Sequence, residues 1–217
     1  MSDFAKTRTT MVDSQLRPNK VSDPAVLDAF LAIQREAFVP GALQGIAYVD
    51  EDLPLGGGRY LLEPMVLARL LQAAAIRPGD VALEIGCATG YASAVLARLA
   101  QSVIAIEADP ALIRAARTNL SATRNVAVFE QQLAAGYPER APYDVILISG
   151  AVAEVPAAIL DQLAETGRLV TVIENPRGGM GEAVVMQRGP AGFARRSLFE
   201  AGTHTLPGLQ PALKFAF

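Results

Sequence analysis

Short apolar runs alternate with amphipathic segments through the middle of the chain. Five runs have the length of strands and apolar interiors, which is typical of strands buried on both faces: VALEI, SVIAIE, NVAVFE, YDVILIS and GRLVTVI. Four intervening segments repeat apolar residues at helical spacing: PMVLARLLQAAA, YASAVLARLA, DPALIRAARTNL and VPAAILDQLA. This order predicts an α/β fold in which helices cover both faces of a parallel sheet.

The two ends of the chain follow other patterns. The stretch SDPAVLDAFLAI predicts a helix that Ser22 or Asp23 caps, with Pro24 in its first turn. Residues 38–60 are rich in glycine and proline, which predicts an irregular binding loop or lid. Beyond Asn175, EAVVMQRG and ARRSLFEA predict a hairpin around Gly189 to Gly192, and residues 203–217 an edge strand. We therefore expect one structural domain made of a helical segment and loop (1–63), an α/β core (64–175) and a hairpin and tail that complete the sheet (176–217).

Composition and charge narrow the class of protein. Of the 217 residues, 51% are apolar, which suffices for a substantial core. A net charge of −3 without a basic block argues against a nucleic-acid partner. The single cysteine, Cys87, excludes an intrachain disulfide and favours a reducing compartment. With neither a secretory signal nor an apolar run of membrane-spanning length, we expect a cytoplasmic protein with no membrane partner. The oligomeric state stays open.

The stretch LEIGCATGY, residues 83–91, follows the first of these strands and opens a helix. Ligands of open parallel sheets bind at such a turn. A dinucleotide fingerprint would need a third glycine where this chain has Tyr91, and a phosphate-binding P-loop would need Gly-Lys-Ser/Thr. What remains is E-x-G-x-x-x-G, which begins with Glu84 and fits a ligand that carries positive charge rather than phosphate.

A second carboxylate supports a nucleoside ligand. Glu107 ends the next strand, 21 positions after Gly86, where a carboxylate can accept both hydroxyls of a ribose. Taken alone, Glu107 is equally well interpreted as a solvated strand end. Together with the glycine loop it favours S-adenosyl-L-methionine as cofactor. Cys87 has no base partner, we expect the only histidine, His204, to lie on the surface, and we predict no metal site.

The order of several motifs resembles the protein-L-isoaspartate O-methyltransferase family. The resemblance runs from about Met11 to Val172 and includes MVDSQL, DPAVLDAF, REAFVP, AYVDEDLPLGGG, LEIGCATGYASAVLA and APYDVILISGA. It implies the class I S-adenosylmethionine-dependent methyltransferase fold, a Rossmann-like, mostly parallel sheet of seven strands with helices on both faces. It also implies methylation of the carboxylate of isoaspartyl residues in damaged proteins or peptides, the first step of their repair.

The resemblance assigns roles to named positions. The residues implied to bind the cofactor are Glu84, Gly86, Cys87, Ala88, Gly90, Tyr91, Glu107 and Gln132. The substrate-side candidates are Gly57, Gly58, Tyr60, Leu61, Leu62 and Ser149. A carboxylate with a pKa of about 4 is already ionised, so methylation needs no general base.

The chain departs from the family pattern in three places. Ala88 stands where the family usually has the middle glycine of its loop, and we expect it to fit only with a negative φ. Gln131-Gln132-Leu133 replaces Gly-Asp-Gly, so the amide oxygen of Gln132 is left to accept from the adenine. Residues 59–62 read Arg-Tyr-Leu-Leu where the family typically reads Gln-Thr-Ile-Ser. Two small hydroxyl residues are thereby lost beside the substrate.

Two alternatives to an isoaspartyl methyltransferase remain at this stage. One is an S-adenosylmethionine-binding protein whose activity is lost or redirected to another acceptor, which the altered stretch at 59–62 favours. The other is a nicotinamide oxidoreductase, which the missing third glycine disfavours.

Overall fold

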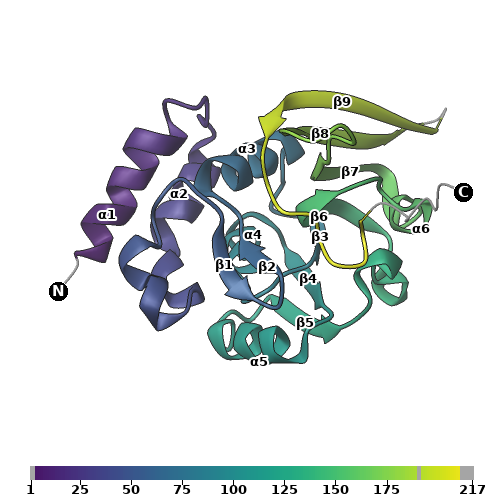
Figure 1. The fold of residues 1–217 in the computed structure, drawn as a ribbon. Helices are drawn as coiled ribbons and strands as arrows, with labels where there is room; N and C mark the ends of the chain where they lie inside the picture. Colours follow the sequence, from purple (N-terminus) through teal and green to yellow (C-terminus); the bar gives the residue numbers. More distant parts are fainter. Residues whose placement is uncertain (1–2, 190–191, 211–217) are drawn as a thin grey trace, which may run out of the picture.

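Seven strands form one sheet in the computed structural model, which describes residues 3–189 and 192–210 (Figure 1). Across the sheet their order is β5-β4-β3-β6-β7-β8-β9. The first five are parallel, and β8 and β9 add an antiparallel hairpin at one edge. Their bounds are β3 Val81–Ile85, β4 Ser102–Glu107, β5 Val126–Glu130, β6 Tyr143–Val152, β7 Leu163–Ile173, β8 Gly181–Gly189 and β9 Gly192–Ala201. The predicted fold class and the predicted hairpin are confirmed.

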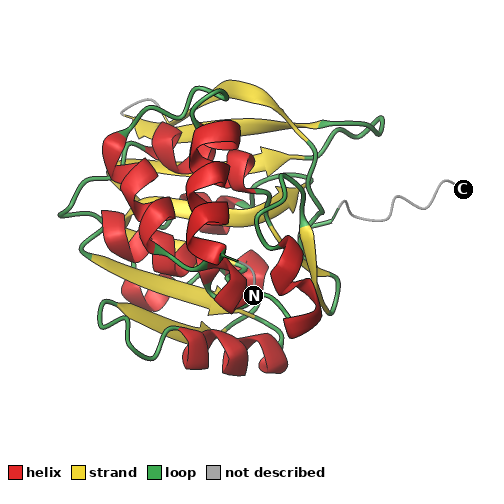
Figure 2. Cartoon of the chain, turned by 90° about the vertical axis from the view of Figure 1, so that its left-hand side faces the viewer, coloured by secondary structure: helices red, strands yellow, loops and turns green. Residues whose placement is uncertain are grey.

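A layer of helices covers one face of the sheet (Figure 2). Its members are α1 Phe4–Met11, α2 Pro24–Ala32, α3 Pro64–Ala74, α4 Tyr91–Leu99 and α5 Pro110–Asn119. Their apolar sides share one buried cluster with inward-facing residues of the strands, such as Ala82 and Val145. The opposite face carries the short helix α6, Ala157–Leu160, and a second cluster that includes Leu206 and Leu209 from the tail. This face is therefore covered in part by the last described residues of the chain.

Aspartates followed by proline begin two of the helices, as the sequence predicts. The Asp23 carboxylate accepts hydrogen bonds from the backbone N–H groups of Ala25 (2.8 Å) and Val26 (3.4 Å), which decides between Ser22 and Asp23 as the cap of α2. Asp109 caps α5 in the same way, with 2.7 Å to the N–H of Ala111. Each cap satisfies backbone donors that the first turn of a helix leaves free.

The loop predicted over residues 38–60 contains more regular structure than expected. A 3₁₀ turn over Gly41–Ile46 is followed by a two-stranded hairpin of β1, Leu53–Gly56, and β2, Arg59–Leu61. The hairpin lies in front of the sheet, close to the ends of β3 and β4 (Figure 1). It brings residues 57–62 over the loop that follows β3.

Two further expectations about elements are wrong in detail. VPAAILDQLA forms only the four residues of α6, because β7 already begins at Leu163. The tail does not add an edge strand within residues 203–210. Instead it crosses the carboxyl end of β6, where Thr205 forms an isolated parallel bridge with Ala151. The rest of the predicted tail strand, residues 211–217, lies outside the described residues.

The strand order of the sheet reverses at the carboxyl end of β3. The chain moves from β3 to β4 and β5 on one side, then returns to β6 on the other side of β3. Ligands of open α/β sheets bind where the strand order reverses in this way. Among the described residues, no helix is both long enough and apolar enough to cross a membrane.

Candidate functional site

The glycine loop turns sharply between β3 and α4. Gly86 has a φ of 80°, and the backbone N–H groups of Gly86 and Cys87 both donate to the carbonyl of Ile106 on β4, at 2.9 and 3.0 Å. Ala88 also takes a left-handed conformation, with a φ of 48°. The expectation that an alanine fits here only with a negative φ is therefore wrong. The turn costs Ala88 about 1–2 kcal/mol relative to glycine.

Glu107, at the end of β4, is buried rather than solvated. Only 1% of its surface is exposed. Its Oε2 accepts a hydrogen bond from the N–H of Ala88 (2.8 Å), and its Oε1 accepts from the N–H of Ala108 (2.8 Å). The carboxylate therefore fixes the position of the glycine loop through the N–H of Ala88. The interpretation of Glu107 as a solvated strand end is wrong.

Arg59, from the β1–β2 hairpin, forms an ion pair with the carboxylate of Glu107. Arg59 Nη2 is 3.2 Å from Glu107 Oε2 and donates to the carbonyl of Gly86 at 2.7 Å. Arg59 is 3% exposed, and its side-chain nitrogens Nε and Nη1 have no hydrogen-bond partner within the described residues. Sequence reasoning noticed Arg59 only as a departure from the family pattern. The signal available in the sequence was a lone cation directly before the apolar residues Tyr60 to Leu62, on the side that the resemblance assigns to the substrate.

Glu84 is the second buried carboxylate of the site. Ser149 donates to Glu84 Oε1 at 2.6 Å, and Ser93 donates to Glu84 Oε2. Burial raises the pKa of Glu84 from 4.5 to about 7, and the two serine hydroxyls oppose that shift. Burial also raises the pKa of the Cys87 thiol, so Cys87 is not an activated nucleophile.

The predicted residues from both sides of the site meet around one very small cavity of about 10 Å³. Its lining includes Tyr60, Leu61, Leu62, Glu84, Gly86, Cys87, Ala88 and Ser149. A volume of this size holds about one water molecule. The structure thus brings together eight of the predicted site residues and leaves little space between them.

The other predicted residues do not line this cavity. Gly57 and Gly58 form the turn between β1 and β2, with Gly57 beside Asp109. Gly90 precedes α4, and the ring of Tyr91 packs edge-on against Phe30 and Phe38 in the core. Gln132 is exposed after β5.

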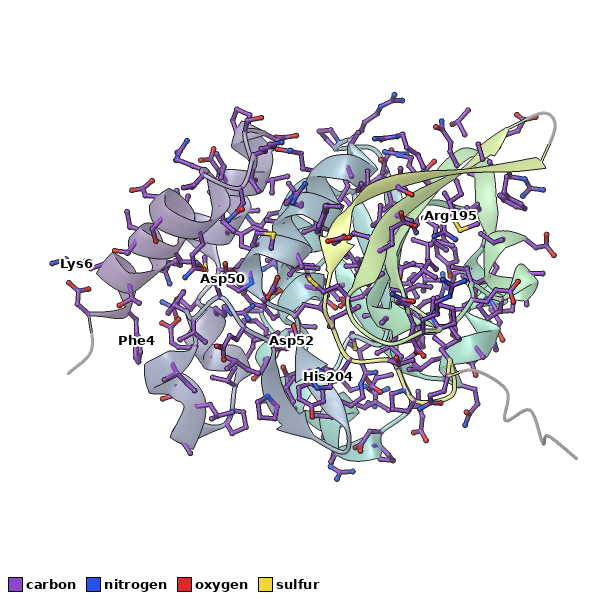
Figure 3. The ribbon with its side chains drawn as sticks, turned by 45° about the horizontal axis from the view of Figure 1, so that its top comes forward. Phe4, Lys6, Asp50, Asp52, Arg195 and His204 are labelled. Atoms are coloured by element: carbon purple, nitrogen blue, oxygen red, sulfur yellow. The ribbon has the colours of Figure 1, made fainter. Side chains whose placement is uncertain are left out.

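The described part of the tail contacts the β1–β2 hairpin and Asp52, which directly precedes β1. His204 stacks on Tyr60, with ring centroids 3.4 Å apart, and its Nδ1 lies 3.3 Å from Asp52 Oδ2. Thr203 donates to the same Asp52 oxygen at 2.5 Å. Figure 3 shows Asp52 and His204 close together at this edge. His204 is half exposed, as expected, but it also contacts the predicted substrate side.

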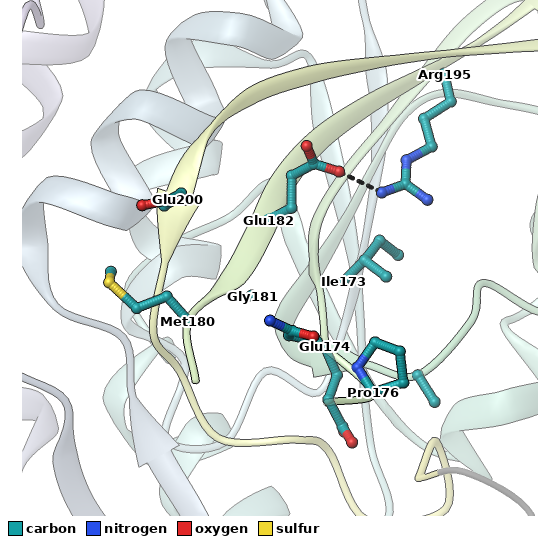
Figure 4. A pocket seen from close by; sticks show the side chains of 10 residues that line it. Ile173, Glu174, Pro176, Met180, Gly181, Glu182, Arg195 and Glu200 are labelled. Atoms are coloured by element: carbon teal, nitrogen blue, oxygen red, sulfur yellow. Dashed lines mark hydrogen bonds and ion pairs between the residues drawn. The ribbon is translucent and has the colours of Figure 1, made fainter. Parts of the chain in front are cut away.

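A larger hollow lies farther along the same end of the sheet (Figure 4). It measures about 550 Å³ and lies between the end of β7 and the hairpin β8–β9. Glu174, Glu182 and Glu200 give it an acidic lining, and Arg195 pairs with Glu182 at 2.5 Å. Sequence reasoning missed this hollow, because its residues come from separate strands whose pairing brings them together.

Comparison with known proteins places the chain in a family. A family model described as protein-L-isoaspartate(D-aspartate) O-methyltransferase (PCMT) matches residues 6–191. The chain belongs to this family. A protein-L-isoaspartate O-methyltransferase of Methylorubrum extorquens (strain PA1) is 45% identical over 197 residues, which are 89% of this chain and 85% of the relative. The corresponding protein of Koribacter versatilis (strain Ellin345) is 38% identical, and the match covers 91% of this chain and 88% of that relative.

Solved structures agree with the fold. A protein-L-isoaspartate O-methyltransferase matches with a TM-score of 0.81 at 28% identity, covering 94% of this chain and 67% of its own. A Plasmodium falciparum protein solved with S-adenosyl-L-homocysteine matches with a TM-score of 0.78 over 95% of this chain and 99% of its own. At 18% identity, that second match supports the fold alone.

Membership of the PCMT family supports S-adenosyl-L-methionine as the cofactor, and the site matches it only in part. The donor groups fit, because a glycine loop after β3 faces a carboxylate at the end of β4. The space does not fit, because pockets for small molecules and cofactors measure about 300–1,000 Å³ and this cavity measures about 10 Å³. In the conformation described, Arg59 pairs with the carboxylate of Glu107, the group that the resemblance assigns to the ribose.

Proposed function

We propose that this PCMT-family chain methylates the abnormal carboxylate of isoaspartyl residues in proteins and peptides, with S-adenosyl-L-methionine as the methyl donor. The observation that carries the proposal is the family match over residues 6–191. It agrees with the strand, glycine loop, helix and strand-end carboxylate found at the switch point of the sheet. The nicotinamide alternative lacks support, because the ring of Tyr91, at the position of the third glycine, lies in the core.

The residues of the site suit an acceptor that needs no activation. A carboxylate is ionised at neutral pH, so the protein has only to align it with the methyl group and exclude water. Burial raises the pKa of the Cys87 thiol, which keeps it protonated and makes it a poor base. Glu84 has a pKa of about 7, but an acceptor that is already ionised does not require it as a base.

We assign the roles at this site as follows. Glu107 and the backbone of Gly86 and Ala88 hold the ribose side of the donor, and Glu84 with Ser149 orders the loop beside it. Tyr60, Leu61 and Leu62 form the wall on the acceptor side, where β2 ends. The apolar wall replaces the hydroxyl groups of Thr and Ser that the family typically carries.

Transfer of a labelled methyl group from S-adenosyl-L-methionine to an isoaspartyl peptide tests the proposal. The matched control is the same peptide with a normal aspartyl residue, since the two differ only in which carboxyl joins the backbone. We expect base-labile methyl ester on the isoaspartyl peptide alone. Equal labelling of both peptides, or of neither, would contradict the proposed acceptor.

A further inference from the structure

We infer that Arg59 and Leu206 together close the cofactor pocket, so that the donor binds only after both side chains have moved away. We call these two residues the occluding pair. This inference rests on the proposed function, because it concerns the same pocket. It assigns the pair a role in controlling access that neither the family match nor the sequence pattern implies.

Arg59 occupies the position at which the carboxylate of Glu107 would meet a ribose. One nitrogen, Nη2, contacts both Glu107 Oε2 (3.2 Å) and the carbonyl of Gly86 (2.7 Å). The same Glu107 oxygen also accepts from the N–H of Ala88. A ribose hydroxyl therefore has to displace the guanidinium before it can bind this oxygen.

Leu206 fills the space on the other side of the loop. A Cβ placed on Gly86 would lie 2.7 Å from Arg59 Nη2 and 3.1 Å from Leu206 Cδ1, so both side chains press on the glycine. A Cβ on Gly150, which follows Ser149 in β6, would lie 2.5 Å from Leu206 Cδ2. Glycine lets a ligand come close to the backbone, but here the side chains of Arg59 and Leu206 already fill that space.

The contacts that hold the occluding pair can open. Nε and Nη1 of Arg59 are buried with no partner among the described residues, and a buried polar group without a hydrogen bond costs about 1–3 kcal/mol. Both nitrogens would regain water if the side chain moved out. Leu206 is held through its backbone N–H, which donates to the carbonyl of Ala151 at 2.8 Å. The neighbouring His204 is held by a stack on Tyr60 and by Asp52, at a half-exposed edge.

The departure at position 59 supports a role for the arginine itself. Where the family typically has a neutral glutamine, this chain has a cation that pairs with the buried carboxylate. A glutamine at this position could not form that ion pair, and its shorter side chain would leave the site more open. R59Q therefore removes the obstruction, and it also removes the counter-charge of the buried Glu107 carboxylate.

Binding of S-adenosyl-L-homocysteine, measured by calorimetry on the whole chain, tests the inference without requiring turnover. We expect R59Q to bind with a dissociation constant at least tenfold lower than that of the native protein. L206A should lower it at least threefold, because it opens the other side of the pocket. R117Q is the matched control, since it removes the same charge from the exposed face of α5 and should leave the dissociation constant unchanged.

Equal or weaker binding by R59Q would overturn the inference, because Arg59 would then assist the ligand or be irrelevant to it. Circular dichroism establishes whether R59Q folds. If it does not fold, L206A decides in the same way, with unchanged or weaker binding as the contrary result. In the native protein, hydrogen exchange gives a second readout. Saturating S-adenosyl-L-homocysteine should speed exchange of the Leu206 N–H, and unchanged protection there would contradict displacement of the tail.

The inference and the proposed function fail in different ways. If R59Q binds S-adenosyl-L-homocysteine tenfold more tightly but neither protein methylates the isoaspartyl peptide, the occluding pair is supported and the acceptor is wrong. If the native protein methylates the peptide and binds as tightly as R59Q, the acceptor is right and the occluding pair is wrong.

Discussion

A buried carboxylate is stable only when charge and hydrogen bonds compensate for its lost hydration, and Glu107 has both. Its partners are Arg59 and the N–H groups of Ala88 and Ala108. We expect Glu107→Gln to lower the free energy of unfolding by about 3–5 kcal/mol, because it leaves the Arg59 cation buried without a counter-charge. Urea denaturation of the two proteins measures this difference.

The matched control is Glu130→Gln. Glu130 pairs with Glu107 in the register of β4 and β5, ends its own strand in the same way, and is exposed. Its substitution should change the free energy of unfolding by less than about 0.5 kcal/mol. Equal losses in both variants would mean that the ion pair with Arg59 contributes nothing specific.

The protonation of Glu84 makes stability depend on pH. Burial raises the pKa of Glu84 from 4.5 to about 7, so the folded protein binds more protons than the unfolded chain between these values. The contribution of Glu84 to stability is therefore complete below about pH 4.5 and is lost as the pH rises through 7. Its full size is about 3 kcal/mol, from 1.36 kcal/mol per pKa unit.

Glu84→Gln removes this titration, so its free energy of unfolding should fall less between pH 5 and pH 8 than that of the native protein. Urea denaturation at several pH values measures both profiles. The pKa of Glu63 is also raised to about 7, chiefly by burial and by nearby Asp50, but Glu63 is present in both proteins and cancels in the comparison. Parallel profiles would show that Glu84 does not titrate in this range.

At the scale of elements, the strands and helices that the sequence predicted correctly are those with a clear local pattern of residues. The parallel strands are short apolar runs, and α2 and α5 start at an aspartate followed by proline. The hairpin β1–β2 was missed because Pro54 and three glycines hide two very short strands with a shift in register. The helix predicted over residues 155–164 is shorter than its pattern suggests, since the last part of that segment pairs with Tyr143 as β7.

The end of β2 carries the proposed acceptor wall. Tyr60 and Leu62 line the small cavity, and Tyr60 also holds the tail through its stack on His204. We expect the double variant Tyr60→Thr, Leu62→Ser to methylate an isoaspartyl peptide at least about tenfold faster, which requires about 1.4 kcal/mol of transition-state stabilisation. The hydroxyl groups supply hydrogen bonds that the apolar side chains lack, and loss of the stack loosens the tail.

Initial rates with labelled donor measure this effect. Leu61→Val makes the same wall smaller without adding a hydroxyl group, so it should not reproduce the tenfold gain. A slower double variant beside an efficient native protein would mean that Tyr60 and Leu62 belong to a working acceptor site.

At the scale of the whole molecule, the site depends on contacts between distant parts of the chain. Thr203 reaches Asp52 across 151 positions, and Leu206 packs on Gly86 and Gly150. No periodicity or spacing encodes such contacts, because they depend on where the tail passes after the sheet has formed. The glycine loop between β3 and α4 was therefore predictable from sequence, whereas the contacts of Arg59 and Leu206 on it were not.

Ligand binding should stabilise the whole fold selectively. A ligand that binds only the folded protein adds about 2.7 kcal/mol to the free energy of unfolding when its concentration is 100 times its dissociation constant. We expect S-adenosyl-L-homocysteine to raise the midpoint of thermal unfolding and NAD to leave it unchanged. A dinucleotide fold needs its third glycine for close packing of the helix against the strand, and this loop has there Tyr91, whose ring packs against Phe30 and Phe38. Because opening of the occluding pair lowers the apparent affinity of the native protein, the shift at a fixed ligand concentration should be larger for R59Q. Stabilisation by NAD and none by S-adenosyl-L-homocysteine in either protein would contradict the assignment of the pocket.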